Sequence, residues 1–87
     1  LEKFDGYWSQ DCAIAAQNIW LAAAAQGLGC VWLGICPIQK REDGMRRLLN
    51  IPEHVTPFAL MSLGWPESEP EERRPRYDPE RIHHDGW

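Results

Sequence analysis

Residues 25–35 constrain the fold most, because they end one regular segment and begin another. Before them, apolar residues recur with i, i+3, i+4, i+7 spacing, which predicts a helix from about residue 10 to residue 26. Its expected N-cap is Ser9 or Asp11, and its expected buried stripe is Cys12, Ala15, Ala16, Ile19, Ala22 and Ala23. Gly27 stands where a glycine commonly ends a helix, and the β-favouring run 30–34 predicts a strand directly after it.

The glycines of this segment do not form a dinucleotide-binding fingerprint. That motif has the order G-x-G-x-x-G, follows a strand and opens a helix. Here the third glycine position is Trp32, and the turn follows a helix and precedes a strand. The sequence therefore excludes a Rossmann phosphate loop at this turn.

Two more regular elements complete a core in residues 1–64. A second helix is predicted from Gln39 or Lys40 to Leu49, and its buried side chains are expected to be Met45, Leu48 and Leu49. The apolar run 57–63 is continuous, which indicates an interior strand buried on both faces. With residues 1–8 as a connector, the order is helix, strand, helix, strand, which is half of an α+β domain.

Residues 65–87 differ in composition from the core. Prolines and acidic residues interrupt this segment and oppose a regular helix. It is either a disordered tail or an extended arm that packs on another surface, and its aromatic and aliphatic side chains favour the arm. Residues 81–84 are candidates for adding a strand to a sheet edge.

The chain is rich in apolar residues for its length. It has 87 residues, 44% of them hydrophobic, and five tryptophans. One interpretation is a Trp-rich core. The other, which we favour, is a surface that needs covering by an N-terminal half or a partner subunit.

Composition also bears on partners and location. The net charge of −4 without a basic stripe argues against nucleic acid as a partner, and no segment has the apolar length of a membrane span. Three cysteines without C-x-x-C spacing indicate neither a disulfide framework nor a zinc site. Free thiols at apolar positions fit a reducing, cytoplasmic location.

Several short motifs, each weak alone, gain meaning from their order. They are Asn18, Gly27-Leu28-Gly29, Trp32-Leu33-Gly34, Leu63-Gly64-Trp65-Pro66 and Arg74-Pro75-Arg76. Together they resemble the C-terminal half of the nitroreductase family of flavoproteins. The resemblance implies FMN as cofactor and hydride transfer from NADH or NADPH, through flavin N5, to nitro compounds, quinones or similar small-molecule acceptors.

The resemblance also implies an architecture. It predicts a mixed or antiparallel sheet flanked by helices, and a homodimer with intertwined C-terminal arms and flavin sites at its interface. The family's arginine- and serine-rich N-terminal segment is not in this sequence. We therefore expect the chain to be a fragment that is inactive without the N-terminal half.

The first candidate site is the backbone at Leu33, Gly34 and Ile35. Reduction concentrates electron density at flavin N5 and O4, and backbone N–H groups are suitable donors there. The resemblance assigns the Gly34 N–H to N5 and the Ile35 N–H to O4. Gly34 has no Cβ to keep the ring at a distance. The alternative is a glycine that merely ends a strand.

The second candidate site is Arg74 and Arg76. Planar guanidinium groups suit a phosphate dianion, and alternate residues of an extended segment project to the same side. The resemblance assigns them to the FMN phosphate. The alternative is a solvated charge run paired with Glu71 and Glu72.

No side chains form a nucleophilic triad or a metal centre, so the protein is expected to position a flavin that performs the chemistry. Two other functions stay open. One is a non-catalytic dimerisation or docking module. The other is a reductive dehalogenase or a flavin-fragmenting enzyme of the same fold.

Overall fold

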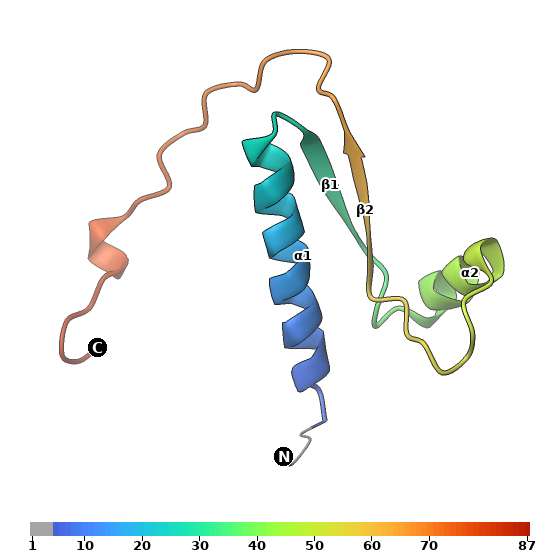
Figure 1. The fold of residues 1–87 in the computed structure, drawn as a ribbon. Helices are drawn as coiled ribbons and strands as arrows, with labels where there is room; N and C mark the ends of the chain where they lie inside the picture. Colours follow the sequence, from blue (N-terminus) through green and yellow to red (C-terminus); the bar gives the residue numbers. More distant parts are fainter. Residues whose placement is uncertain (1–4) are drawn as a thin grey trace.

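The computed structural model describes residues 5–87, and the connector residues 1–4 lie outside the described part. Figure 1 shows a long helix beside a two-stranded antiparallel hairpin, with a second helix on one side and an extended arm on the other. The elements are α1 (Tyr7–Ala25), β1 (Gly29–Gly34), α2 (Gln39–Leu49), β2 (Ala59–Gly64) and the short 3-10 helix η1 (Pro79–Arg81). The predicted order of helix, strand, helix and strand is confirmed, and the fold is α+β.

The start of α1 differs from the prediction. The helix begins at Tyr7, so Ser9 and Asp11 lie inside it and neither is its N-cap. Gly6 precedes the helix with φ of 93°, a left-handed conformation that glycine adopts without strain. The Ser9 hydroxyl donates to Gly6 O at 2.7 Å, so it closes the first turn from within.

The end of α1 matches the prediction. Gly27 has φ of 77°, and its N–H donates to Ala24 O at 3.0 Å. The Leu28 N–H donates to Ala23 O, also at 3.0 Å. These two bonds form a Schellman motif, which reverses the chain and leads directly into β1.

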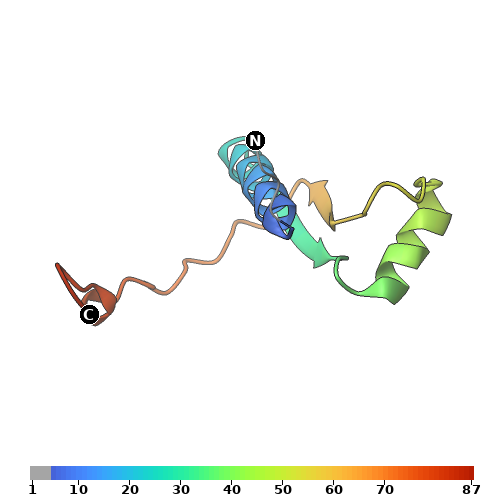
Figure 2. The same ribbon diagram turned by 90° about the horizontal axis from the view of Figure 1, so that it is seen from below.

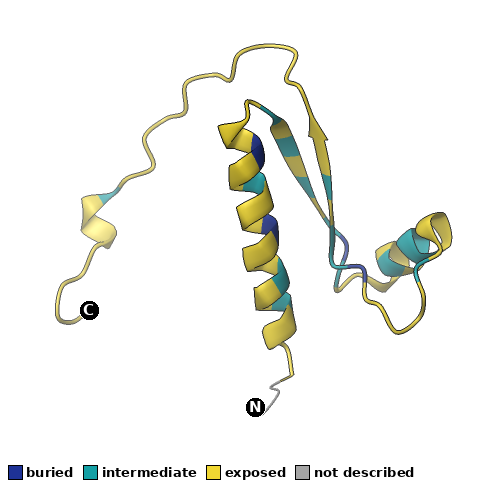
Figure 3. Cartoon of the chain, viewed as in Figure 1, coloured by how far each residue is buried: buried dark blue, intermediate teal, exposed yellow. Residues whose placement is uncertain are grey.

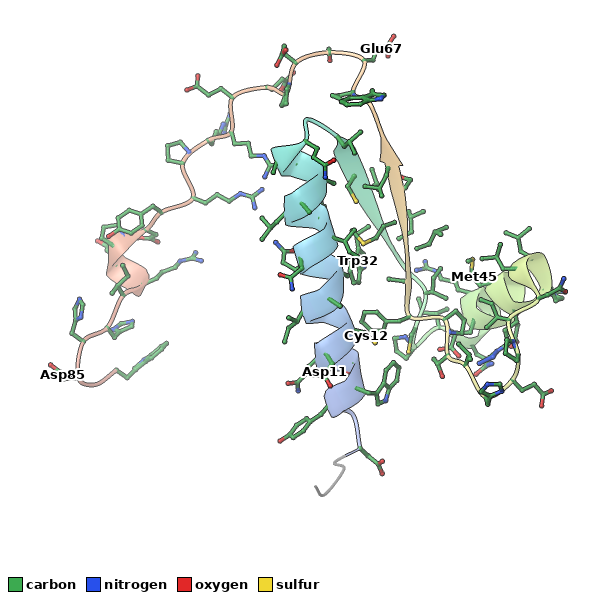
Figure 4. The ribbon with its side chains drawn as sticks, in the orientation of Figure 1. Asp11, Cys12, Trp32, Met45, Glu67 and Asp85 are labelled. Atoms are coloured by element: carbon green, nitrogen blue, oxygen red, sulfur yellow. The ribbon has the colours of Figure 1, made fainter. Side chains whose placement is uncertain are left out.

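Aromatic side chains join α1 to one face of the hairpin. Trp32 projects from β1 toward α1 and stacks on Trp20, with ring centroids 6.4 Å apart (Figure 4). Phe58 meets Trp32 edge-on at 5.8 Å and Trp8 at 5.9 Å. Small residues of α1 allow this close packing, since Ala16 and Ala23 are the buried residues of the helix.

The predicted stripe of α1 is partly wrong. Ala16 and Ala23 are buried and Cys12 is half-buried, whereas Ala15, Ile19 and Ala22 are exposed. The helix carries apolar residues all round, so spacing alone did not identify the side that meets Trp32 and Phe58. A helix of this kind is typical of a protein interior.

Other residues that were expected to be buried are also exposed in the described part of the chain. On α2, Met45 is half-buried, but Leu48 is 74% exposed and Leu49 is exposed as well. β2 pairs only with β1, so the prediction of an interior strand covered on both faces does not hold within residues 5–87. The outer face of the hairpin presents Val31, Leu33 and Leu60 without a second layer.

The shape of the molecule is open. The radius of gyration is 17.5 Å, whereas a compact domain of this length has about 12 Å. Figure 3 shows that the fully buried residues of the described chain lie on α1, on the side of the hairpin, and in the loops beside α2. Residues 5–87 therefore lack a core large enough to stabilise them as an isolated domain.

The arm runs in an extended conformation past the C-terminal end of α1. Figures 1 and 2 show that it leaves the hairpin on the side opposite α2. Near its end, η1 is capped by Asp78, which accepts from Glu80 N at 3.2 Å and from Arg81 Nε at 3.1 Å. Residues 81–84 form no strand in the described chain, and the sheet contains only β1 and β2 there.

Candidate functional site

The candidate flavin donors lie where β1 ends. The Ile35 N–H donates to Phe58 O at 3.2 Å, and the Cys36 N–H donates to the same oxygen at 3.0 Å. In an antiparallel strand, neighbouring residues direct their backbone N–H and C=O groups to opposite edges. Gly34 therefore directs both of its backbone groups away from β2, to the free edge of β1.

A side chain of α2 confirms this direction for the Gly34 carbonyl. Arg41 NH1 donates to Gly34 O at 2.8 Å. Within residues 5–87, no group accepts a hydrogen bond from the Gly34 N–H. The free edge of β1 thus presents one unpaired backbone donor beside a guanidinium.

Nothing in the described chain requires residue 34 to be glycine. Its φ is not in the left-handed region, and an added Cβ would lie 3.6 Å from Trp32 Nε1, an ordinary contact. The missing side chain instead keeps the backbone open to a planar molecule. The unpaired N–H and the open backbone both fit a flavin ring at this edge.

The two neighbours of Gly34 are placed differently. Leu33 lies opposite Leu60 on the outer face of the hairpin and is 45% exposed. Ile35 is 7% exposed, and its N–H is already paired with Phe58 O. The assignment of the Ile35 N–H to flavin O4 therefore conflicts with the strand pairing, which continues one residue past β1 and uses that donor.

The candidate phosphate ligands lie on the extended arm. Arg74 and Arg76 are exposed and make no hydrogen bond or ion pair in the described part of the chain. The alternative pairing with Glu71 and Glu72 does not occur, since the ion pair recorded in residues 5–87 joins Arg81 and Asp78. Both guanidinium groups are thus available to an anion.

One chain does not bring the two candidate sites together. Gly34 lies opposite Ala59, at the α2 end of the hairpin, whereas the arm leaves after Gly64 at the other end (Figure 1). These ends are about 17 Å apart along the strands. From Gly64 the arm continues away from Gly34.

A groove that could hold a small molecule also lies away from Gly34. It measures about 900 Å³ and lies between the C-terminal end of α1 and the start of the arm. Arg73 lines it beside Trp20 and Ala24, so this arginine faces α1 while its neighbours Arg74 and Arg76 do not line the groove. Nothing in the sequence distinguishes Arg73 from Arg74 and Arg76.

The thiols and acids of the described residues do not suggest further chemistry. Desolvation and a hydrogen bond to the Glu42 carboxylate raise the pKa of Cys36, so its thiol stays protonated at neutral pH. No cluster of His, Cys, Asp and Glu suited to a metal ion occurs in residues 5–87. In the same range, no helix has the length and apolar character needed to cross a bilayer.

Comparisons with known proteins identify the family to which the chain is similar. The model of the "Nitroreductase family" matches residues 2–65. A protein of Methanothermobacter thermautotrophicus named "Putative NADH dehydrogenase/NAD(P)H nitroreductase" is 53% identical over 87 residues, which are 100% of this chain and 45% of that protein. An "FMN reductase (NADPH)" of Bacillus subtilis is 32% identical over 86% of this chain and 29% of its own length.

Solved structures agree. The crystal structure of a "Putative NADH Oxidase" from Clostridium acetobutylicum has a TM-score of 0.86 and 38% identity, over 99% of this chain and 52% of that one. The chain thus spans about half the length of the relatives it matches, or less. The order of elements, the glycine turn and the match over most of the sequence lead to one conclusion: the chain belongs to the nitroreductase family.

Proposed function

We propose that the complete protein is an FMN-dependent oxidoreductase that takes hydride from NADH or NADPH and reduces nitro compounds, quinones or similar acceptors. The observation that carries this proposal is the unpaired Gly34 N–H on the free edge of β1. The family match supports it, as do the names of the relatives, which include an NADPH-dependent FMN reductase. Bound FMN supplies the hydride chemistry.

The residues of this chain have a positioning role. Gly34 donates its N–H to the N5 edge of the ring, which becomes more electron-rich on reduction. The Ile35 N–H donates to Phe58 O and so fixes the backbone next to Gly34, and it would not be available as a donor to the flavin. Arg74 and Arg76 hold the phosphate, and Pro75 between them limits the conformations of the segment.

Two copies of the chain complete each site in this proposal. Gly34 and the arginine pair lie toward opposite ends of the hairpin, so the arm of one protomer supplies the phosphate ligands for the ring bound by its partner. The uncovered faces of α1 and the hairpin are the surfaces on which the rest of the dimer packs.

The test is a visible absorption spectrum of the complete purified protein, followed by titration of the FMN-free form with FMN. The proposal predicts a flavin band, tight FMN binding and bleaching of the band by NADH or NADPH. A complete, folded protein that does not bind FMN would instead indicate a docking module. Bleaching by NAD(P)H with recovery only on halogenated acceptors, or loss of the flavin itself, would identify one of the other same-fold enzymes.

A further inference from the structure

Arg41, in the first turn of α2, makes a contact that joins two elements. Its NH1 group donates to Gly34 O at 2.8 Å, across seven positions of sequence. A guanidinium is planar and charged at any physiological pH, so this hydrogen bond to a backbone oxygen is charge-assisted. The contact fixes the last residue of β1 relative to α2.

The peptide between Gly34 and Ile35 is therefore held at both ends. Its carbonyl accepts from Arg41, and its N–H donates to Phe58 O at 3.2 Å. Glycine has no side chain to limit its backbone rotation, so its direction depends on such outside contacts. Because a strand residue presents its own N–H and C=O at one edge, Arg41 also lies on the edge to which the Gly34 N–H points.

We propose that Arg41 is a positioning residue for the flavin. It holds the backbone at Gly34 so that the N–H stays directed at the ring, and its charge on the same edge favours the electron-rich, reduced ring. This inference rests on the proposed FMN function. It adds a side chain of α2 to a site otherwise built from backbone groups and the arm.

The same helix supplies two matched controls. Arg46 NH1 also donates to backbone oxygens, at 2.7 Å to Val55 O and 3.3 Å to Pro52 O, but these belong to the loop before β2. Lys40 is next to Arg41 and exposed, and its side chain makes no hydrogen bond or ion pair in the described residues. Substitution of Arg46 thus tests the effect of a weaker attachment of α2 in general. Substitution of Lys40 tests the effect of losing one positive charge from the same helical turn as Arg41.

The experiment uses the complete FMN-loaded protein and measures the FMN midpoint potential and the FMN dissociation constant. Arg41→Met removes both the donor and the charge, so the potential should become more negative and FMN should bind on the order of tenfold more weakly. Arg41→Gln keeps a neutral donor and should recover affinity more than potential. Arg41→Lys keeps the charge and should recover the potential.

The controls separate this role from a structural one. Arg46→Met should lower thermal stability and leave the potential near that of the wild type, and Lys40→Met should change neither. A wild-type potential in a folded Arg41→Met protein overturns the inference, as does an equal shift in Arg46→Met or Lys40→Met. If Arg41→Met does not fold, the Gln and Lys variants decide by the same criteria. Absence of FMN binding in the wild type would overturn the proposed function itself.

Discussion

At the scale of single residues, Arg74 and Arg76 are unpaired cations on an extended segment. If they hold the FMN phosphate, Arg74→Ala or Arg76→Ala should each weaken FMN binding about tenfold to a hundredfold, because a hydrogen bond to a charged group contributes roughly 1.5–3 kcal/mol. Titration of the FMN-free complete protein, followed by flavin fluorescence, measures this change. Arg47→Ala, which removes an exposed cation from α2, is the control and should leave the affinity unchanged. Unchanged affinity in both arm variants would contradict the phosphate assignment.

A second residue-scale prediction concerns Cys36. Desolvation and the interaction with Glu42 raise the pKa of its thiol, so less thiolate is present at any given pH than in the unfolded chain. Glu42→Gln should lower this pKa. Because the thiolate is the nucleophile, the rise of the iodoacetamide alkylation rate with pH should then occur at lower pH. Mass spectrometry of Cys36 peptides against pH, with Cys12 and Cys30 replaced by Ser, checks this. Identical profiles with Glu and Gln at position 42 would exclude the carboxylate as a cause.

At the scale of elements, the turn between α1 and β1 depends on Gly27. Its φ of 77° strains any other residue except Asn or Asp, although an added Cβ would have room, 3.8 Å from Trp65 Cζ3. Gly27→Ala should therefore cost about 1–2 kcal/mol in the free energy of unfolding of the complete protein. Denaturant unfolding measures it.

Gly44 serves as a control for Gly27, because its substitution by alanine is expected to have the opposite effect on stability. It lies within α2, has a helical backbone and would meet nothing within 4 Å if it carried a Cβ. Gly44→Ala should stabilise the protein by about 0.5–1 kcal/mol, because alanine loses less backbone entropy in a helix. If Gly27→Ala were also stabilising, the left-handed conformation at position 27 would not be what requires glycine there.

The order and type of the elements could be predicted from the sequence, but their contacts could not. The spacing of apolar residues in the helices, the glycine that ends α1 and the apolar runs of the two strands are local properties, and they located α1, β1, α2 and β2. The faces that pack depend on distant residues, such as Phe58, which meets both Trp8 and Trp32. The first turn of α1 was missed because Gly6, which has no capping side chain, precedes it.

In the candidate site, too, single positions could be predicted from the sequence but contacts between distant residues could not. The resemblance to the nitroreductase family directed attention to the backbone of Gly34, and in residues 5–87 the N–H of that residue has no acceptor. The use of the Ile35 N–H by Phe58 O depends on strand register, which no motif encodes. The contact of Arg41 with Gly34 O joins a helix to a strand end and leaves no pattern in the sequence.

At the scale of the whole molecule, the open shape and the distance between the two candidate sites lead to a prediction about assembly. If Gly34 of one protomer and the arginine pair of its partner hold the same FMN, defects in different chains should complement each other. Gly34→Pro removes the edge-facing N–H without taking a donor from the β1–β2 ladder. Arg74→Ala combined with Arg76→Ala removes the phosphate ligands from the other chain.

A tag-selected heterodimer of these two variants distinguishes the arrangements. With shared sites, one site receives the intact Gly34 and the intact arginines, and the other receives both defects, so about one FMN should bind for every two chains. With both sets supplied by the same chain, each site carries one defect and neither binds FMN well. Flavin absorbance per chain in the purified heterodimer, compared with each variant homodimer, gives the answer. A heterodimer as poor in flavin as the two homodimers would place Gly34 and the arginine pair in one protomer, and the arm would then have to fold back along its own hairpin.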